Sequence, residues 1–433
     1  MNTKDRFRNF HLVRAGLLGL AATASLLAQT ATLTTLDDFT GSDGSYPSAG
    51  VVVGPGGILY GTTNGLGIGI GSVYSLTPPA SPGGAWTENV LYTFAPGTGP
   101  YAGVVIGGGG VLYGTTPNGG AGPCTGGCGT VFSLTPPASS AGAWTATVLH
   151  NFGAGADGAN PSGGVVIGEG GVLYGTTQGS ETTGAGAVFS LTPPQSTGGS
   201  WTKRTLHTFG NYAGYDGYDP IAGVVIGGGG VLYGTTYTGG YDNTGTVFSL
   251  IPPASPGEAW TENQIYSFQN GNDGAFPYAP VAIGADGVLY GTTASGGTTH
   301  ANGTVFSMTP PTSPGGAWTP AIIHDFVGKI DGGGGDGSDP RSGVTIGRYG
   351  VLYGTTFSGG NGPSDNGTVY SLTPPSSPGG SWTETVLYDF PPVGGGIGAG
   401  PYGGVVFGAG EVLYGTTQAG GTSNVGTVFS LTP

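Results

Sequence analysis

The sequence predicts an all-β protein, a seven-bladed β-propeller with four antiparallel strands in each blade. The first observation behind this prediction is the string Leu-Tyr-Gly-Thr-Thr, which recurs seven times at spacings of 53 to 63 residues. The second is that each copy contains short runs of β-branched and aromatic residues bounded by Gly or Pro. The third is the lack of helical periodicity in the repeats. Four strands repeated radially form the blade of a propeller.

The second copy of the repeat shows the four runs, which we name A to D. Run A spans residues 102–107, run B 111–116, run C 129–137 and run D 143–152. Their composition favours strands, and the Gly-rich segments between them favour tight turns because Gly adopts a positive φ without strain. The A–B and C–D turns are expected on one face of the ring, and the B–C and D–A loops on the other.

The two ends of the chain are expected to share the last blade. Run C of the seventh copy ends at Pro433, and no run D follows it. A D-like run, residues 36–39, lies at the start of the repeats, with Ala31 where the other D runs have Trp. We therefore predict that the N-terminal strand completes the last blade, which removes an open sheet edge.

Residues 1–30 are predicted to be a signal peptide, and residues 31–433 to form the propeller. Four basic residues lie in the first fourteen positions, and residues 15–28 form an apolar stretch that is short for a membrane span. A short membrane anchor is the alternative interpretation. We expect secretion to the extracellular space or the periplasm, no membrane span in the mature chain, and a monomer.

The charge of the chain argues against nucleic acid as a partner. Charged residues make up only 7% of the sequence, and the formal net charge is −14. A sparse, acidic surface repels phosphate backbones. No metal-ligand spacing and no nucleotide-binding loop is apparent, so we predict neither a metal site nor a cofactor.

The two cysteines, Cys124 and Cys128, lie in one short segment, Pro-Cys-Thr-Gly-Gly-Cys. An exported protein meets oxidising conditions, so a local disulfide is expected. The alternative is a metal site, which needs more ligands, and no His or third Cys lies nearby.

With these motifs in hand, the chain resembles the bacterial tandem-repeat family called GloVer (Gloeo/Verruco repeat). The resemblance rests on Leu-Tyr-Gly-Thr-Thr, on Gly-Thr-Val-Phe-Ser-Leu-Thr-Pro and on the aromatic residues of run D, and it covers nearly all of residues 31–433. It implies export and residence at the cell surface or outside the cell. It implies no established activity and no catalytic residues.

A repeated aspartate marks the D–A loops as candidate sites. Five of these loops carry Asp-Gly-x-x-Pro, with the aspartates at Asp43, Asp157, Asp216, Asp273 and Asp336. One interpretation is turn chemistry, because Asp caps its own backbone. The other is a ring of carboxylates that binds cations or sugar hydroxyls, although calcium takes about six to eight oxygen ligands.

We predict that any ligand binds on the face that carries the B–C and D–A loops. The B–C loops differ strongly between copies, and variable loops on a rigid scaffold are where binding sites usually arise. Tyrosines on this face, Tyr215, Tyr218 and Tyr237, are candidate ligand contacts together with the five aspartates. The six Trp are expected to pack between blades, with sugar stacking as the alternative. Three D-run histidines are expected to be strand-face residues.

The sequence favours a non-catalytic binding or interaction propeller, for an extracellular polysaccharide or a surface protein. No arrangement of nucleophile, base and acid is apparent in it. One alternative is a propeller-type glycoside hydrolase or lyase, which needs unrepeated polar residues at the channel mouth. Another is a structural extracellular repeat protein.

Overall fold

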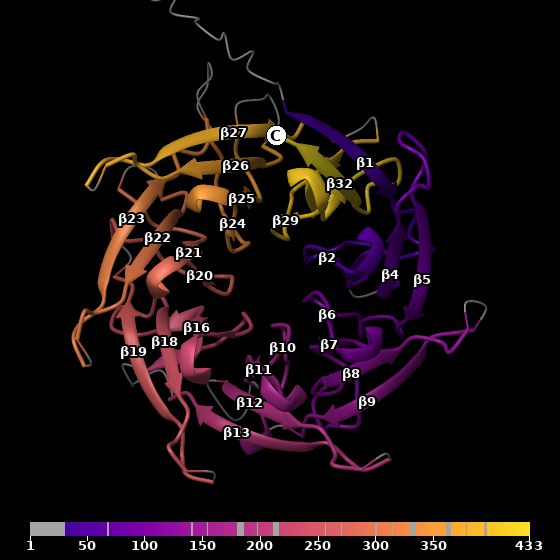
Figure 1. Ribbon diagram of the computed structural model, residues 1–433, viewed down its shortest axis with the longest axis horizontal. Coiled ribbons are helices and arrows are strands. Elements are labelled where there is room, and N and C mark those ends of the chain that lie inside the picture. The colour runs from indigo at the N-terminus through magenta and orange to yellow at the C-terminus, as the bar shows by residue number, and fades with distance from the viewer. Residues whose placement is uncertain are drawn as a thin grey trace, which may run out of the picture. The chain divides into compact units, whose positions relative to one another are not determined.

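Residues 31–433 form a ring of seven four-stranded antiparallel sheets (Figure 1). The computed structural model describes these residues except 67–68, 140–141, 154, 180–185, 197, 211–215, 256, 270, 299–300, 314, 330–334, 361–364, 378 and 394–395. The predicted all-β fold and the seven-bladed propeller are confirmed. The predicted signal peptide, residues 1–30, lies outside the described residues.

Each of the first four blades takes its strands from one continuous stretch of chain. In order from the axis outward they are β2 (Val52–Val53), β3 (Leu59–Thr63), β4 (Ser72–Thr77) and β5 (Thr87–Thr93); β6 (Val105–Ile106), β7 (Leu112–Thr116), β8 (Thr130–Thr135) and β9 (Thr145–Asn151); β10 (Val166–Ile167), β11 (Leu173–Thr177), β12 (Ala187–Thr192) and β13 (Thr202–Thr208); and β15 (Val225–Ile226), β16 (Leu232–Thr236), β18 (Thr246–Ile251) and β19 (Thr261–Ser267).

The last three blades follow the same order. Their strands are β20 (Ala282–Ile283), β21 (Leu289–Thr293), β22 (Thr304–Thr309) and β23 (Thr319–Asp325); β24 (Thr345–Ile346), β25 (Leu352–Thr356), β26 (Thr368–Thr373) and β27 (Thr383–Asp389); and β29 (Val406–Phe407), β30 (Leu413–Thr417), β32 (Thr427–Thr432) and β1 (Thr32–Asp38). Two small loop ladders pair β14 (Gly217–Tyr218) with β17 (Thr238–Gly239) and β28 (Gly398–Ala399) with β31 (Ala419–Gly420).

Short 3-10 turns are the other regular elements of the described chain. Seven of them form the A–B turns: η1 (Pro55–Gly57), η2 (Gly108–Gly110), η4 (Glu169–Gly171), η5 (Gly228–Gly230), η6 (Ala285–Gly287), η7 (Arg348–Gly350) and η8 (Ala409–Glu411). One more, η3 (Gly155–Asp157), lies in a D–A loop. Across the residues that the structure describes, no helix has the length and apolar character to cross a membrane.

The innermost strands are shorter than the sequence predicts. Run A of residues 102–107 contributes only the two residues of β6 to the ladder. Its Gly103 faces the preceding blade instead, because a Cβ on this residue would lie 3.2 Å from the carbonyl oxygen of Gly50. At the axis, the neighbouring blades thus approach each other through backbone, which leaves little room for a longer ladder.

The first and last strands of the chain close the ring, as predicted. Strand β1 pairs antiparallel with β32 from Thr32 opposite Thr432 to Asp38 opposite Thr427, and the two lie side by side in Figure 1. The missing Trp is compensated from the same blade. Tyr353 packs against Phe407 with ring centroids 5.1 Å apart. The other copies have Val or Ile where this blade has Phe407.

The hydrophobic core of the described chain consists of seven clusters, each between two neighbouring blades. At every boundary the Phe that ends run D of one blade meets the run C ring of the next edge to face. The centroids are 5.0–5.6 Å apart in the pairs Phe39–Tyr74, Phe94–Phe132, Phe152–Phe189, Phe209–Phe248, Phe268–Phe306, Phe326–Tyr370 and Phe390–Phe429.

The six tryptophans also lie between blades. Each meets the tyrosine of Leu-Tyr-Gly-Thr-Thr in the preceding blade, with centroids 5.7–6.2 Å apart, in the pairs Trp86–Tyr414, Trp144–Tyr60, Trp201–Tyr113, Trp260–Tyr174, Trp318–Tyr233 and Trp382–Tyr290. This edge-to-face geometry suits the quadrupole of aromatic rings. The tryptophans therefore pack, as the sequence favours.

A glycine in each second strand makes room for the run C ring. The ring of Phe248 lies against Gly234, where an added Cβ would be 2.5 Å from Cζ of the phenylalanine. The same approach, below 3 Å, recurs at the glycine of all seven Leu-Tyr-Gly-Thr-Thr strings. A side chain at this position is excluded by the ring, not by the backbone conformation.

We expect the substitution Gly234→Ala to destabilise the protein by about 1–3 kcal/mol, because the new methyl group overpacks a filled site. Gly228→Ala is the matched control in the same blade, since an added Cβ there has nothing within 4 Å. The measurement is the free energy of unfolding from denaturant titration. Equal stability of the two variants would contradict the role assigned to the glycine.

The boundary at which the ring closes carries a cluster of acidic groups. Among the described residues, Asp37 Oδ2, Glu88 Oε1 and Tyr74 Oη are buried without a hydrogen-bond partner. Burial, together with the charge of Asp43, raises the pKa of Asp37 to about 6. Burial, with the charges of Asp37 and Asp43, raises the pKa of Glu88 to about 7. Both carboxyl groups therefore hold their protons at mildly acidic pH in the folded protein.

This cluster predicts that closure weakens as the pH rises. When the pKa of a carboxyl is higher in the folded than in the unfolded chain, the free energy of unfolding decreases as the pH rises from about 4 to the folded pKa. We expect the melting temperature to fall from pH 5 to pH 8, and to fall less in Asp37→Asn/Glu88→Gln. The exposed Glu169→Gln is the control, and it should follow the wild type. An equal fall in the double variant would contradict this assignment.

Candidate functional site

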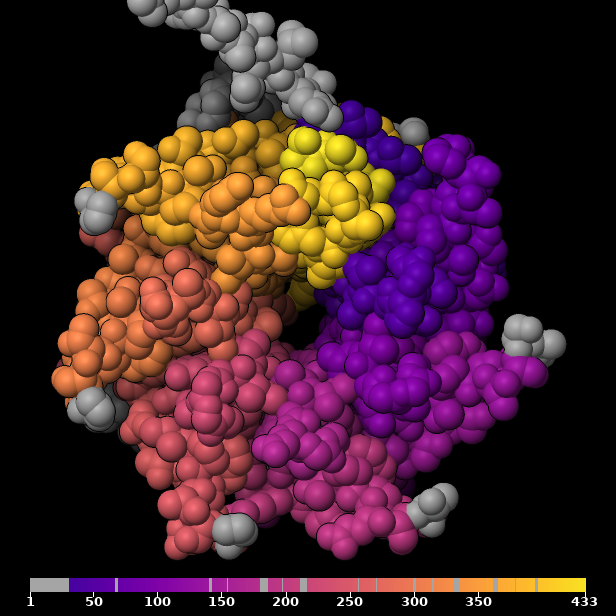
Figure 2. Space-filling view, in the orientation of Figure 1, coloured from indigo at the N-terminus to yellow at the C-terminus, as the bar shows by residue number. Residues whose placement is uncertain are grey.

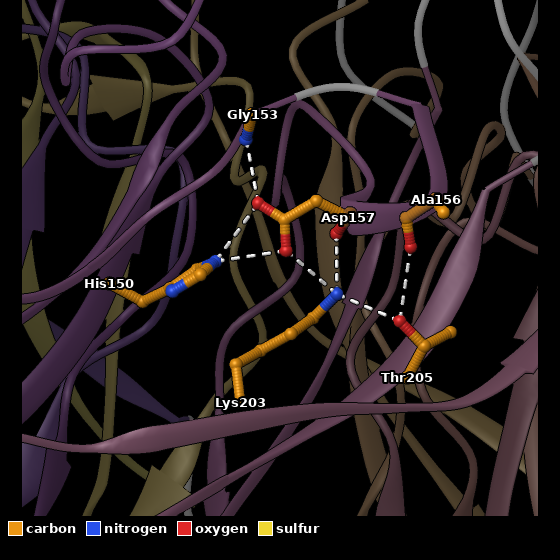
Figure 3. Close-up of polar contacts among 6 residues, drawn as sticks. All are labelled: His150, Gly153, Ala156, Asp157, Lys203 and Thr205. Atoms are coloured by element: carbon orange, nitrogen blue, oxygen red, sulfur yellow. Dashed lines mark hydrogen bonds and ion pairs between the residues drawn. The ribbon is translucent and has the colours of Figure 1, made fainter.

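The D–A loop aspartates predicted as ligand contacts are each engaged by their own loop. Asp157 accepts a hydrogen bond from the N–H of Gly153 at 2.7 Å, and its Oδ1 lies 3.1 Å from Nε2 of His150 and 2.9 Å from Nζ of Lys203 (Figure 3). Burial alone would raise the pKa of Asp157, but the hydrogen bond and charge of Lys203 hold it below its ordinary value. The carboxylate fastens the loop to strand β9.

The other four aspartates make related contacts. Each accepts from the first N–H after run D, in the pairs Thr40–Asp43, Gly210–Asp216, Gln269–Asp273 and Val327–Asp336. Three of them also meet a ring of the same run D, in the pairs His207–Asp216, Tyr266–Asp273 and His324–Asp336. The D-run histidines are thus strand residues whose partners are these aspartates. The sequence contains a signal for this pairing: each D run that has a histidine is followed by a D–A loop that has the aspartate.

The three candidate tyrosines fall in different surroundings. Tyr218 lies in β14 and packs against the core cluster between the third and fourth blades. Tyr237 follows β16, with its ring 5.2 Å from Phe276 and 5.5 Å from Tyr278. Tyr215 lies outside the described residues. Of the three, Tyr237 belongs to the site described next.

The cysteines close a tight loop in the second blade. Cys124 and Cys128 are joined by a disulfide, with Cα atoms 5.0 Å apart. Cys128 is fully buried in the cluster between the second and third blades. The bond lies in the B–C loop, on the face of the candidate site.

A cavity of about 760 Å³ runs along the axis of the ring, and the hollow is visible at the centre of Figure 2. Its wall is formed by the small and apolar residues of the A runs. Its end toward the D–A loops is lined by the residue that follows the loop proline in each blade, namely Ser48, Tyr101, Ser162, Ile221, Tyr278, Arg341 and Tyr402. We call this end the mouth. The seven residues differ in size, polarity and charge, although their flanks repeat.

The backbone that presents these residues is nearly the same in every blade. The residue before the proline is left-handed in six loops, as at Asp339 with φ 55°. Its carbonyl accepts from the N–H that follows Leu-Tyr-Gly-Thr-Thr, as from Phe357 to Asp339 at 3.1 Å. The proline that comes next has a fixed φ. The side chains of Arg341 and Phe357 therefore project from adjacent points of the backbone.

The first threonine of Leu-Tyr-Gly-Thr-Thr fastens the mouth of the next blade. Its Oγ1 donates to the carbonyl one residue after the mouth residue, at 2.7–3.1 Å, in Thr62–Ala102, Thr115–Gly163, Thr176–Ala222, Thr235–Ala279, Thr292–Ser342, Thr355–Gly403 and Thr416–Ala49. All seven boundaries carry this bond, including the one at which the ring closes. The mouth is therefore rigid, and only its side chains vary.

One half of the mouth, which we call the aromatic half, combines rings with one cation. The guanidinium of Arg341 lies 4.1 Å from the ring centroid of Phe357, 5.2 Å from that of Tyr402 and 5.9 Å from that of Tyr278. Tyr278 and Tyr402 are also in edge contact with each other, at 5.8 Å. With Tyr237 beside Tyr278, the half presents several ring surfaces around a fixed positive group.

The opposite half, which we call the amide half, carries hydroxyl and amide groups. Asn64 and Gln418 both donate to Oγ of Ser48. Further around the ring, the hydroxyl of Ser162 donates to Oε1 of Gln178 at 3.1 Å. These groups are half-buried or buried, and each retains donor or acceptor capacity for a ligand.

Charged groups occur in both halves, with Asp219 beside Gln178 and Arg341 between Tyr278 and Tyr402. Burial raises the pKa of Asp219 to about 6, although a hydrogen bond from Gln178 opposes the shift. Asp339 accepts from Nε of Arg341 at 2.8 Å, and this hydrogen bond and charge raise the pKa of the arginine despite its burial. Sequence reasoning missed these residues. The signal available was that the positions after the loop proline and after Leu-Tyr-Gly-Thr-Thr vary between copies with constant flanks.

Solved structures similar to this chain are distant in sequence. A putative oxidoreductase (glucose dehydrogenase) from Thermus thermophilus is 15% identical, with a TM-score of 0.40, over 93% of this chain and 100% of its own. PorZ, a surface component of the type-IX secretion system of Porphyromonas gingivalis, is 14% identical, with a TM-score of 0.45, over 84% of this chain and 46% of its own. A Trypanosoma rangeli sialidase is 11% identical, with a TM-score of 0.40, over 94% of this chain and 59% of its own.

A family model identifies the repeat itself. No curated protein matches the chain. Residues 121–334 match the model described as the Gloeobacter/Verrucomicrobia repeat, the family that the motifs resemble. Residues 121–334 therefore consist of repeats of the Gloeobacter/Verrucomicrobia family.

Proposed function

We propose that this chain is an exported, non-catalytic binding propeller that holds an extracellular saccharide at the mouth of its central cavity. One observation carries the proposal. Residues that differ between repeats, on a backbone that otherwise repeats, converge on one cavity of about 760 Å³. A rigid scaffold with varied side chains at one place is the usual arrangement of a binding site.

The chemistry of the mouth favours a saccharide. The rings of the aromatic half, such as Tyr278 and Tyr402, offer faces on which the C–H side of a sugar ring can stack. The amide half, with Ser162 and Gln178, offers donors and acceptors for sugar hydroxyls. A folded protein partner ordinarily binds over a broad area of surface, whereas the mouth is a concave site lined by residues of mixed polarity.

The proposed ligand binds on the face that the sequence predicts, but at the mouth of the cavity and not at the D–A loop aspartates. Tyr237 remains among the contacts, because it lies beside Tyr278. The five D–A loop aspartates, Asp157 among them, hold their loops and stand behind the mouth residues instead of touching the ligand.

A glycoside hydrolase is the second candidate, and one observation favours it. Asp219 has its pKa raised to about 6 by burial, so it is a carboxyl able to donate a proton near the mouth. A hydrolysis assay on every saccharide that binds decides between the two functions. Turnover that is lost in Asp219→Asn would support the hydrolase.

The test of the binding function is a glycan array probed with the mature protein, followed by calorimetry on each hit. We expect Tyr278→Ala and Gln178→Ala, one from each half, to weaken binding by about tenfold or more. Tyr349→Ala is the control, because this tyrosine is 93% exposed in η7 on the opposite face. A saccharide whose affinity responds to Tyr349→Ala and not to the mouth variants would contradict the proposal.

A further inference from the structure

Arg341 is the one charged side chain among the described residues that line the cavity. Its position in the ring, directly after the loop proline, is occupied by Ser, Tyr or Ile in the other blades. An arginine at a binding site ordinarily attracts anionic groups, because the guanidinium fits carboxylates and sulfates. The surroundings of Arg341 decide whether it does so here.

The charge of Arg341 is already neutralised. Asp339 Oδ2 lies 2.8 Å from Nε and 2.7 Å from Nη2 of the arginine, so one carboxylate oxygen faces both donors. The side chains are 30% and 27% exposed, so solvent screens the pair only in part. A ligand therefore meets an ion pair of zero net charge, with donors and an acceptor side by side.

The arginine is also fixed in place. Its guanidinium is stacked on Phe357 at 4.1 Å and flanked by the rings of Tyr402 and Tyr278. To turn toward an anion it would have to leave both the ion pair and the stack. The guanidinium also makes a hydrogen bond with the hydroxyl of Tyr402, so it is held at a fixed orientation beside a phenol group that a sugar hydroxyl can meet.

We infer that the mouth selects uncharged, hydroxyl-rich saccharides over uronic acids, with the Arg341–Asp339 pair as the element that sets this preference. The inference rests on the proposed function. The net charge of the propeller favours the same selection, because residues 31–433 contain 5 basic and 22 acidic residues and so repel anionic saccharides. An anionic sugar would lose hydration at the mouth without meeting an unpaired cation.

The experiment compares sugars that differ only at C6. The probes are β-1,4-linked hexamers of mannose and mannuronate, and of glucose and glucuronate, measured by calorimetry at low salt. Wild type should bind the neutral member of a pair more tightly. Asp339→Asn removes the neutralising carboxylate and suits the left-handed backbone, because Asn tolerates positive φ. It should shift the ratio of affinities toward the uronate by about tenfold.

Asp286→Asn is the matched control. Asp286 has the same φ of 55° and is exposed in η6 on the opposite face, so it removes one negative charge away from the mouth. Tighter binding of the uronate by wild type, or an equal shift in the two variants, would overturn the inference and leave the proposed function intact. Binding of neither member of either pair, together with no saccharide bound on the glycan array, would overturn both.

Discussion

The whole ring depends on the contact between a glycine and an aromatic ring that is repeated in every blade. Because Gly234 has no side chain, the ring of Phe248 packs directly against the second strand and extends toward the preceding blade. There it meets Phe209 edge to face, at 5.1 Å. Strand pairing within a blade and packing between blades therefore share one residue. The strict repetition of Leu-Tyr-Gly-Thr-Thr follows from this double role.

Much of the fold could be predicted because its determinants repeat. Seven copies of one motif predicted the number of blades, and the displaced D-like run predicted the closure by β1. The short inner strands escaped prediction, because their length is set by contacts between glycines of neighbouring blades. The mouth also escaped it. Arg341, Phe357 and Tyr402 come from two blades, and only the ring geometry brings them together.

The chain separates the residues that hold the fold from the residues that vary. Main-chain bonds and Oγ1 of one threonine per blade determine where each mouth residue lies. The side chain at the mouth takes no part in those bonds. Ser, Tyr, Ile and Arg are thus accepted at equivalent positions. The division into an aromatic half and an amide half follows from this freedom.

The antiparallel pairing of β1 with β32 has a geometric consequence for both ends of the propeller. Thr32 lies opposite Thr432, so the first strand starts where the last one ends. That edge of the blade belongs to the face of the A–B and C–D turns, and the mouth opens on the other. A propeller tethered to a surface through either end would thus direct the face with the mouth away from that surface, toward the surrounding solution.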